Sequence, residues 1–162
     1  MVQAREYKTI DSIVLSNYIL KHYGPMSHLK LQKLLFYSDA YCLAYFGKEL
    51  ITDQFEAWVH GPVSRKVFQE LKGQAVLYTD VEYSETPGMD VDEKFSKLTS
   101  DQQALVTDVL SQLASWTGLE LERATHSEKP WQLARVGYDA AQPCHEIISK
   151  EETARYYKRD IA

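Results

Sequence analysis

The fold is decided by the stretch from Ser27 to Phe46, which reads SHLKLQKLLFYSDAYCLAYF. Ser27 suits a helix N-cap, and the glycine that follows the stretch is a typical helix stop. Apolar side chains fall on two opposite faces of the predicted helix, with Leu31, Leu34, Leu35, Cys42 and Tyr45 on one and Phe36, Ala40, Leu43 and Ala44 on the other. A helix that is apolar on nearly all sides belongs in the middle of a bundle. We therefore predict a mainly α, single-domain helical bundle around this central helix.

Further helices are predicted on both sides of this segment. Apolar spacing and end signals place them at residues 11–23, 62–72, 101–116, 118–125 and 150–159, with one more short helix starting near residue 127. Ser100 with Gln103, and Ser149 with Glu152, have the capping-box pattern. The chain then forms the bundle by packing these amphipathic helices against the central one.

The remaining segments are predicted to be extended or irregular. Residues 49–60 favour an extended segment, and residues 75–83 leave open a weak strand or a short β-hairpin. Residues 80–93 hold six acidic side chains and no basic one, around Pro87-Gly88. Such a charge run is usually a solvated loop, and a partner-binding arm is the alternative.

The central helix carries polar side chains that need partners or water. They are Lys30, Gln32, Lys33 and Asp39. We expect Lys33 to pair with Glu56, which is a structural role that we favour over contact with a partner protein. Tyr37, Tyr41 and Tyr45 recur every four residues, a stripe that is more often core than binding surface.

Charge and hydropathy exclude several classes of function. The chain has 162 residues and a formal net charge of −5, whereas nucleic-acid binders normally present a basic surface. No apolar run reaches the roughly 18 residues that a membrane helix requires. Residues 1–8 are polar and lack a signal-peptide core. We therefore expect a cytoplasmic protein that binds neither nucleic acid nor membrane.

No catalytic, cofactor-binding or metal-ligating residues are predicted. Nucleotide-binding loops, GxSxG and HExxH are all absent from the sequence. Cys42 is expected in the core, and the adjacent pair Cys144-His145 does not complete a tetrahedral site. His60 and His126 lie near turn-forming prolines, where hydrogen bonds to the turn are favoured over catalysis. An enzyme assembled from distant residues stays an alternative, because catalytic groups can converge in space.

Five motifs in sequence order carry a resemblance to a known family. They are Lys30-Leu31-Gln32-Lys33-Leu34-Leu35-Phe36-Tyr37, Gly47-Lys48-Glu49-Leu50, Glu56-Ala57-Trp58, Val59-His60-Gly61-Pro62-Val63 and Thr125-His126-Ser127-Glu128-Lys129-Pro130-Trp131. In this order and spacing the chain resembles the Panacea domain, also described as SocA-like or phage-associated GepA-like. The resemblance extends over roughly residues 10 to 160, so residues 1–162 are treated as one Panacea-like domain. One departure is His60, where the family pattern commonly has tyrosine.

The resemblance implies an antitoxin that neutralises a cognate toxin by direct protein–protein binding in a toxin–antitoxin system, and no enzymatic activity. The alternative that it leaves is a proteolytic adaptor that delivers a toxin to a cytosolic AAA+ protease. The implied partners are thus a toxin protein and, for the adaptor, that protease. The candidate partner-binding or family-motif residues are Lys30, Gln32, Lys33, Tyr37, Trp58, His60, His126 and Trp131.

Overall fold

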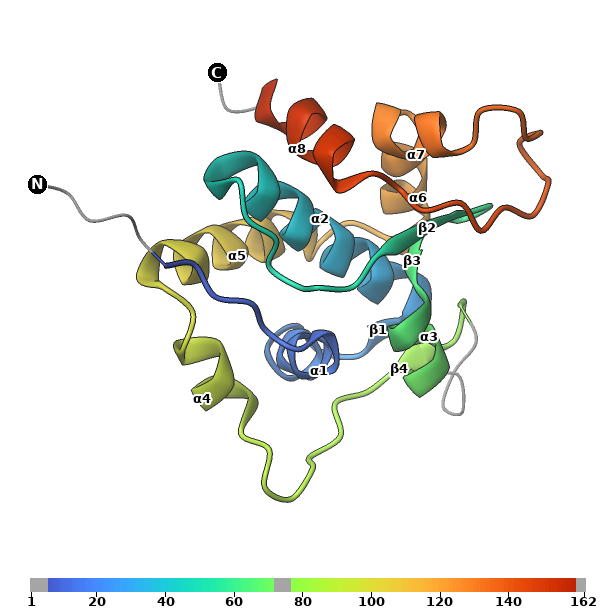
Figure 1. The fold of residues 1–162 in the computed structure, drawn as a ribbon. Helices are drawn as coiled ribbons and strands as arrows, with labels where there is room; N and C mark the ends of the chain where they lie inside the picture. Colours follow the sequence, from blue (N-terminus) through green and yellow to red (C-terminus); the bar gives the residue numbers. More distant parts are fainter. Residues whose placement is uncertain (1–5, 72–76, 160–162) are drawn as a thin grey trace, which may run out of the picture.

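The structure is a computed structural model that describes residues 6–71 and 77–159. Within these residues it is mainly α-helical with two small antiparallel sheets, which confirms the predicted fold class (Figure 1). The helices are α1 (Ser12–Tyr23), α2 (His28–Phe46), α3 (Arg65–Leu71), α4 (Val91–Ser96), α5 (Ser100–Leu113), α6 (Gly118–His126), α7 (Lys129–Ala134) and α8 (Lys150–Lys158). The strands are β1 (Met26–Ser27), β2 (Phe55–Trp58), β3 (Gly61–Ser64) and β4 (Asp80–Val81).

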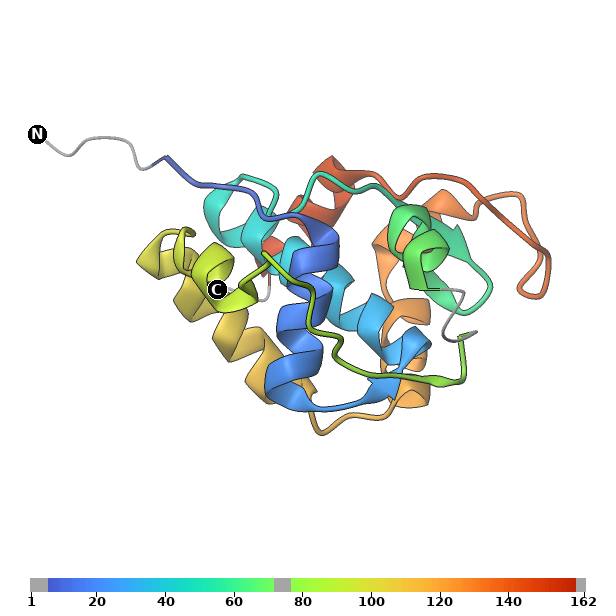
Figure 2. The same ribbon diagram turned by 90° about the horizontal axis from the view of Figure 1, so that it is seen from below.

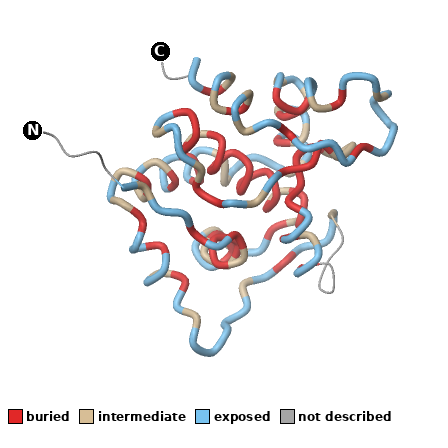
Figure 3. The backbone as a smooth tube through the Cα atoms, viewed as in Figure 1, coloured by how far each residue is buried: buried red, intermediate tan, exposed pale blue. Residues whose placement is uncertain are grey.

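Helix α2 is the centre of the bundle, as predicted. It contacts α1, α3, α5, α6, α8 and the strands β1 and β3, and Figures 1 and 2 show α1, α5 and α8 around it. The Ser27 side chain caps its first turn, and Gly47 ends it in the left-handed conformation, with φ 69°. Buried residues follow one another along its whole length (Figure 3). The all-round apolar pattern therefore reflects enclosure by neighbouring elements.

Asp39 is one of the polar residues that this enclosure buries, with only 2% of its surface exposed. Its carboxylate accepts hydrogen bonds from the backbone N–H groups of Leu50, at 2.8 Å, and Ile51, at 3.2 Å. It also lies 3.2 Å from the ammonium group of Lys150, the first residue of α8. Asp39 thus fastens both the segment that leaves α2 and the start of α8 to the central helix.

The structure contains a short β-hairpin, formed by strands β2 and β3. It lies at residues 55–64, whereas the sequence suggested a possible hairpin at residues 75–83. Trp58 pairs with Gly61 and Phe55 with Ser64. The helix predicted from residue 62 consequently begins only at Arg65, and its predicted end at residue 72 lies outside the described residues. The reason is a contact from α2: Gln32 accepts from the Ser64 N–H at 2.9 Å and donates to the Ser64 carbonyl at 3.2 Å. This side chain holds residue 64 extended as a neighbouring strand would.

Residues 77–98 contain more structure than the sequence predicted. Strand β4 lies within the expected segment 75–83, of which residues 75 and 76 are outside the described part, and pairs with β1. Helix α4 was missed: Asp90 caps it, and Val91 and Phe95 are buried one turn apart. Residues 82–90 are largely exposed, as expected for a solvated loop (Figures 1 and 3).

The predicted start of α5 is corrected by one residue. The capping box joins Thr99 to Gln102, not Ser100 to Gln103, and the helix ends at Leu113. Gln102 is favoured because it is buried and its side-chain amide also donates to the Lys8 carbonyl, at 2.7 Å. The other late helices are close to the predictions, and the Ser149 hydroxyl caps α8 by accepting from the Glu152 N–H.

Replacing Asp39 tests whether its contacts hold the fold together. Asp39→Ala leaves two buried N–H groups and a partly buried ammonium without their carboxylate, so we expect the free energy of unfolding to fall by about 3 kcal/mol. The control is Asp92→Ala, since Asp92 binds Lys21 and His22 at the exposed surface, where such pairs contribute less than about 1 kcal/mol. Urea unfolding measures both. Equal losses for the two variants would contradict the role given to Asp39.

Candidate functional site

The family-motif residues meet at the turn between β2 and β3, where we define a hairpin cluster of Lys33, His60, Glu122, His126 and Trp131. The Lys33 ammonium donates to the Pro62 carbonyl at 3.0 Å, and the His60 ring lies 3.0 Å from the Glu122 carboxylate. The His126 ring stacks on Trp131 with centroids 4.1 Å apart, and the Trp131 indole donates to the Trp58 carbonyl at 2.8 Å. Helices α2, α6 and α7 therefore all attach to this turn.

Lys33 is the most deeply buried cation of the cluster. Its side chain has no exposed surface, and burial lowers the pKa of Lys33 to about 7, although the nearby Glu122 carboxylate opposes the shift. The backbone of Gly61 presses against the lysine stem: a Cβ at Gly61 would lie 2.4 Å from Lys33 Cε and 2.9 Å from Thr125 Oγ1. Gly61 also has φ of +108°. The turn therefore requires glycine for both its conformation and its space.

The predicted pair between Lys33 and Glu56 is wrong. Glu56 instead binds Arg65 through two hydrogen bonds of 2.9 Å. Neighbouring side chains of a strand point to opposite faces. Phe55 faces α2 and contacts Phe36 edge-on, so Glu56 lies on the other face, where it also accepts from the Trp58 indole. Arg65 holds the pKa of Glu56 below its ordinary value, against the effect of burial.

The two histidines of the cluster make contacts that support the turn. His60 bonds to Glu122 and to the Tyr78 hydroxyl. His126 interacts with the Val59 backbone, its pKa is lowered chiefly by burial, and its Nε2 is buried without a hydrogen-bond partner among the described residues. The adjacent Thr125 hydroxyl donates to the Glu122 carbonyl. A nucleophilic site needs a hydroxyl or thiol bonded to a base. The Tyr78 hydroxyl beside His60 is such a contact, whereas the Thr125 hydroxyl bonds to a backbone carbonyl.

Three other predicted residues fasten elements outside this cluster. Lys30 donates to the Ala114 carbonyl at the end of α5, at 2.5 Å, and burial lowers its pKa. Gln32 holds Ser64, as described above. Trp58 packs edge-on against Phe68 of α3. These side chains connect α2 and the hairpin to neighbouring elements, and the sequence did not reveal their partners.

Tyr37, the remaining predicted residue, opens a second region, which we call the tyrosine groove. It is about 330 Å³ in volume, lies between α2 and the segment from α5 to the start of α7, and is defined here by Tyr37, Tyr41, Tyr45, Asp108, Trp116 and Glu128. Tyr37 is buried, whereas half of the Tyr45 surface is exposed. The prediction that the three tyrosines belong to the core is therefore correct for Tyr37 and wrong for Tyr45. Asp108 and Trp116 were missed as site residues, although the sequence places both on one amphipathic segment.

At the bottom of the groove a carboxylate accepts two phenol hydrogen bonds. Tyr37 donates to Glu128 Oε1 at 2.6 Å, and Tyr157 of α8 donates to the same oxygen at 2.8 Å. Burial, with the Glu128 charge, raises the pKa of both phenols. They therefore stay protonated donors, and the groove carries the negative charge of Glu128.

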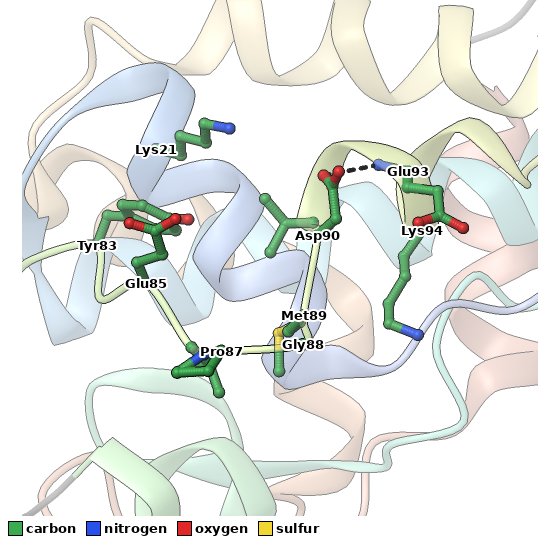
Figure 4. A pocket seen from close by; sticks show the side chains of 11 residues that line it. Lys21, Tyr83, Glu85, Pro87, Gly88, Met89, Asp90, Glu93 and Lys94 are labelled. Atoms are coloured by element: carbon green, nitrogen blue, oxygen red, sulfur yellow. Dashed lines mark hydrogen bonds between the residues drawn. The ribbon is translucent and has the colours of Figure 1, made fainter.

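A separate hollow of about 590 Å³ lies between α1 and residues 83–94, with Lys21, Tyr83 and Asp90 among its lining residues (Figure 4). The predicted site residues lie elsewhere. No group of three or more His, Cys, Asp or Glu side chains in residues 6–71 and 77–159 is placed to hold a metal ion. In the same ranges no helix combines the length and apolar character needed to cross a bilayer.

The buried lysine predicts a specific pH dependence of stability. Between the folded pKa of about 7 and the ordinary value of 10.5, the unfolded chain binds more protons, so stability rises with pH in that window and is flat below it. Relative to Lys33→Met, the free energy of unfolding of the wild type should rise by about 2 kcal/mol from pH 7 to pH 9. Urea unfolding of both proteins at several pH values measures this. A difference that does not change with pH would show that Lys33 is not buried as an ammonium with a lowered pKa.

The glycine turn gives a second prediction. Gly61→Ala should lower the free energy of unfolding by about 3 kcal/mol, because strain at positive φ and overpacking against Lys33 add. Gly88→Ala is the matched control: its φ is +81°, but a Cβ there meets nothing within 4 Å, so only a strain of about 1 kcal/mol is expected. Thermal and urea unfolding compare them. If the two substitutions prove equally tolerated, the close approach to Lys33 does not constrain the turn.

Comparisons with known proteins bear on this arrangement. The family model for the SocA-like antitoxin, Panacea domain, matches residues 31–132, which is more than half of the chain and includes every residue that defines the hairpin cluster and the tyrosine groove. The comparisons with curated proteins and with solved structures found no match. On the strength of the family match, this chain belongs to the SocA-like antitoxins and carries their Panacea domain.

Proposed function

We propose that this protein is an antitoxin that neutralises a cognate toxin by binding it directly, in the cytoplasm and without catalysis. The observation that carries the proposal is the match of the SocA-like antitoxin family over residues 31–132. The antitoxin family implies a protein partner, and exposed aromatic side chains are frequent anchors of protein interfaces. Tyr45 and Trp116, at 50% and 40% exposure, are anchors of this kind.

The contacts of the polar motif residues agree with a role in binding rather than catalysis. Gln32 and Lys33 donate to backbone carbonyls of β3, and His126 stacks on Trp131. Side chains committed in this way maintain a scaffold. The partner surface is then expected among exposed residues, where a substitution changes binding more than it changes stability.

Co-expression with the protein encoded by the neighbouring gene tests the proposal. We expect the chain to restore growth that the neighbouring product inhibits, and the two purified proteins to elute together and bind with a 1:1 or other fixed stoichiometry in titration calorimetry. Absence of both growth rescue and a complex would refute the proposal. Growth rescue that occurs only when a AAA+ protease is present, with a shortened toxin half-life, would favour the adaptor alternative instead.

A second experiment separates binding from catalysis. The double variant His60→Tyr, His126→Phe removes both titratable rings of the hairpin cluster but keeps an aromatic ring at each position. We expect it to bind the toxin and restore growth as the wild type does, with circular dichroism confirming that it folds. A folded double variant that still binds the toxin but no longer protects cells would point to an enzyme.

A further inference from the structure

The tyrosine groove is bounded by rigid elements on each side. Tyr37, Tyr41 and Tyr45 lie at successive turns of α2 and so span about 12 Å along the helix. Asp108 is on α5, Trp116 follows it, and Glu128 precedes α7. Tyr157 of α8 packs edge-on against Tyr37, at 5.9 Å, and lies close to Tyr41, at 5.4 Å. The groove is thus a preformed hollow whose floor is held by α8 from behind.

Exposure increases from the floor of the groove to its rim. Tyr37 is buried and bonded to Glu128, Tyr41 is half-buried, and Tyr45 and Trp116 are exposed. Large aromatic side chains that are exposed beside a concave surface are the usual anchors of a protein interface. Because Tyr45 is on α2 and Trp116 follows α5, a segment bound in the groove can contact aromatic side chains on both sides.

The charge of the groove identifies what fits it. Asp108 and Glu128 contribute carboxylates, and the described residues that line the groove include neither lysine nor arginine. The hollow at α7 and α8 has the opposite character, with Lys129, Arg155 and Arg159 in its lining. Aromatic faces beside carboxylates are a setting for a guanidinium or ammonium group, which can stack on the rings while pairing with the acid.

We propose that the tyrosine groove docks a short segment of the partner toxin that carries an arginine or lysine between apolar side chains. The basic group lies near Asp108 and Glu128, and the apolar neighbours contact Tyr45 and Trp116. Electrostatic complementarity of this kind favours one partner over others and speeds association. The inference rests on the proposed function, because it names the surface through which the antitoxin would bind its toxin.

Single substitutions in the groove test this docking site in the full chain, with the neighbouring gene's product as the probe. Tyr45→Ala and Trp116→Ala should each weaken the complex by at least about tenfold, as expected for interface anchors. Asp108→Lys should weaken it by about tenfold and reduce its dependence on salt, because a favourable charge contact becomes repulsive. Asp108 is exposed, and its side chain accepts a surface hydrogen bond from Gln112. Because surface contacts of this kind contribute little to stability, this variant should keep the wild-type melting temperature.

Matched control variants lie away from the groove. Glu85→Lys makes the same charge change as Asp108→Lys in the exposed loop. Leu133→Ala in α7 and Val136→Ala just after it, which we call the α7 variants, remove exposed apolar side chains. We expect these variants to bind like the wild type in calorimetry. An Arg→Glu change in the toxin that restores binding to Asp108→Lys would locate the basic residue.

The outcomes distinguish the inference from the proposed function. Weakened binding by folded groove variants alone supports the docking site. Wild-type affinity in all groove variants, with a stable wild-type complex, overturns the docking site and leaves the antitoxin function standing. Loss of binding confined to the α7 variants overturns it as well and moves the interface to that surface. A wild-type chain that forms no complex refutes the proposed function and, with it, the inference.

Discussion

The structure depends on satisfying the polar side chains that α2 carries into the middle of the bundle. Gln32 bonds to Ser64, Lys33 to Pro62, and Asp39 to the backbone of residues 50 and 51 and to Lys150. Each unsatisfied buried polar group costs about 1–3 kcal/mol, against a total stability of about 5–15 kcal/mol for a typical domain. Loss of two such partners would therefore remove much of the stability. The polar residues thus determine which elements can lie beside α2, while the apolar residues supply the burial.

This constraint accounts for the polar motif residues that α2 carries in this chain. Lys30 donates to the backbone carbonyl of Ala114 after α5, and Gln32 and Lys33 donate to the carbonyls of Ser64 and Pro62 in β3. The carbonyl groups at the ends of helices and strands need donors, and long flexible side chains can reach them from a central helix. These motif side chains therefore connect elements, whereas Tyr37 and Glu128, which also belong to the motifs, reach the groove.

Features that local sequence patterns determine, such as helix bounds, were predicted from the sequence. Features that depend on contacts between distant residues were missed. The bounds of α1, α2 and α8 follow from caps and periodicity, which act within a few residues of each helix end. Strand β3 was read as the start of a helix, because its extended form depends on Gln32, thirty-two positions earlier in the chain. The pair of Lys33 with Glu56 failed for a related reason, since the face on which Glu56 lies is set by how the hairpin packs on α2. The groove could not be predicted, because its walls come from helices that the sequence does not orient.

The buried contacts and the exposed groove are linked through the same helix. Tyr37 and Tyr45 are two turns apart on α2, and the first is tied through Glu128 to Tyr157 of α8. The backbone beneath Tyr45 is therefore fixed before any partner arrives, so binding orders only its side chain, which has two rotatable angles. A preformed surface of this kind avoids the loss of backbone entropy that a flexible loop would incur on binding. Under the docking that we propose, the interior polar bonds of α2 contribute to recognition as well as to stability, because they hold the backbone that presents Tyr45.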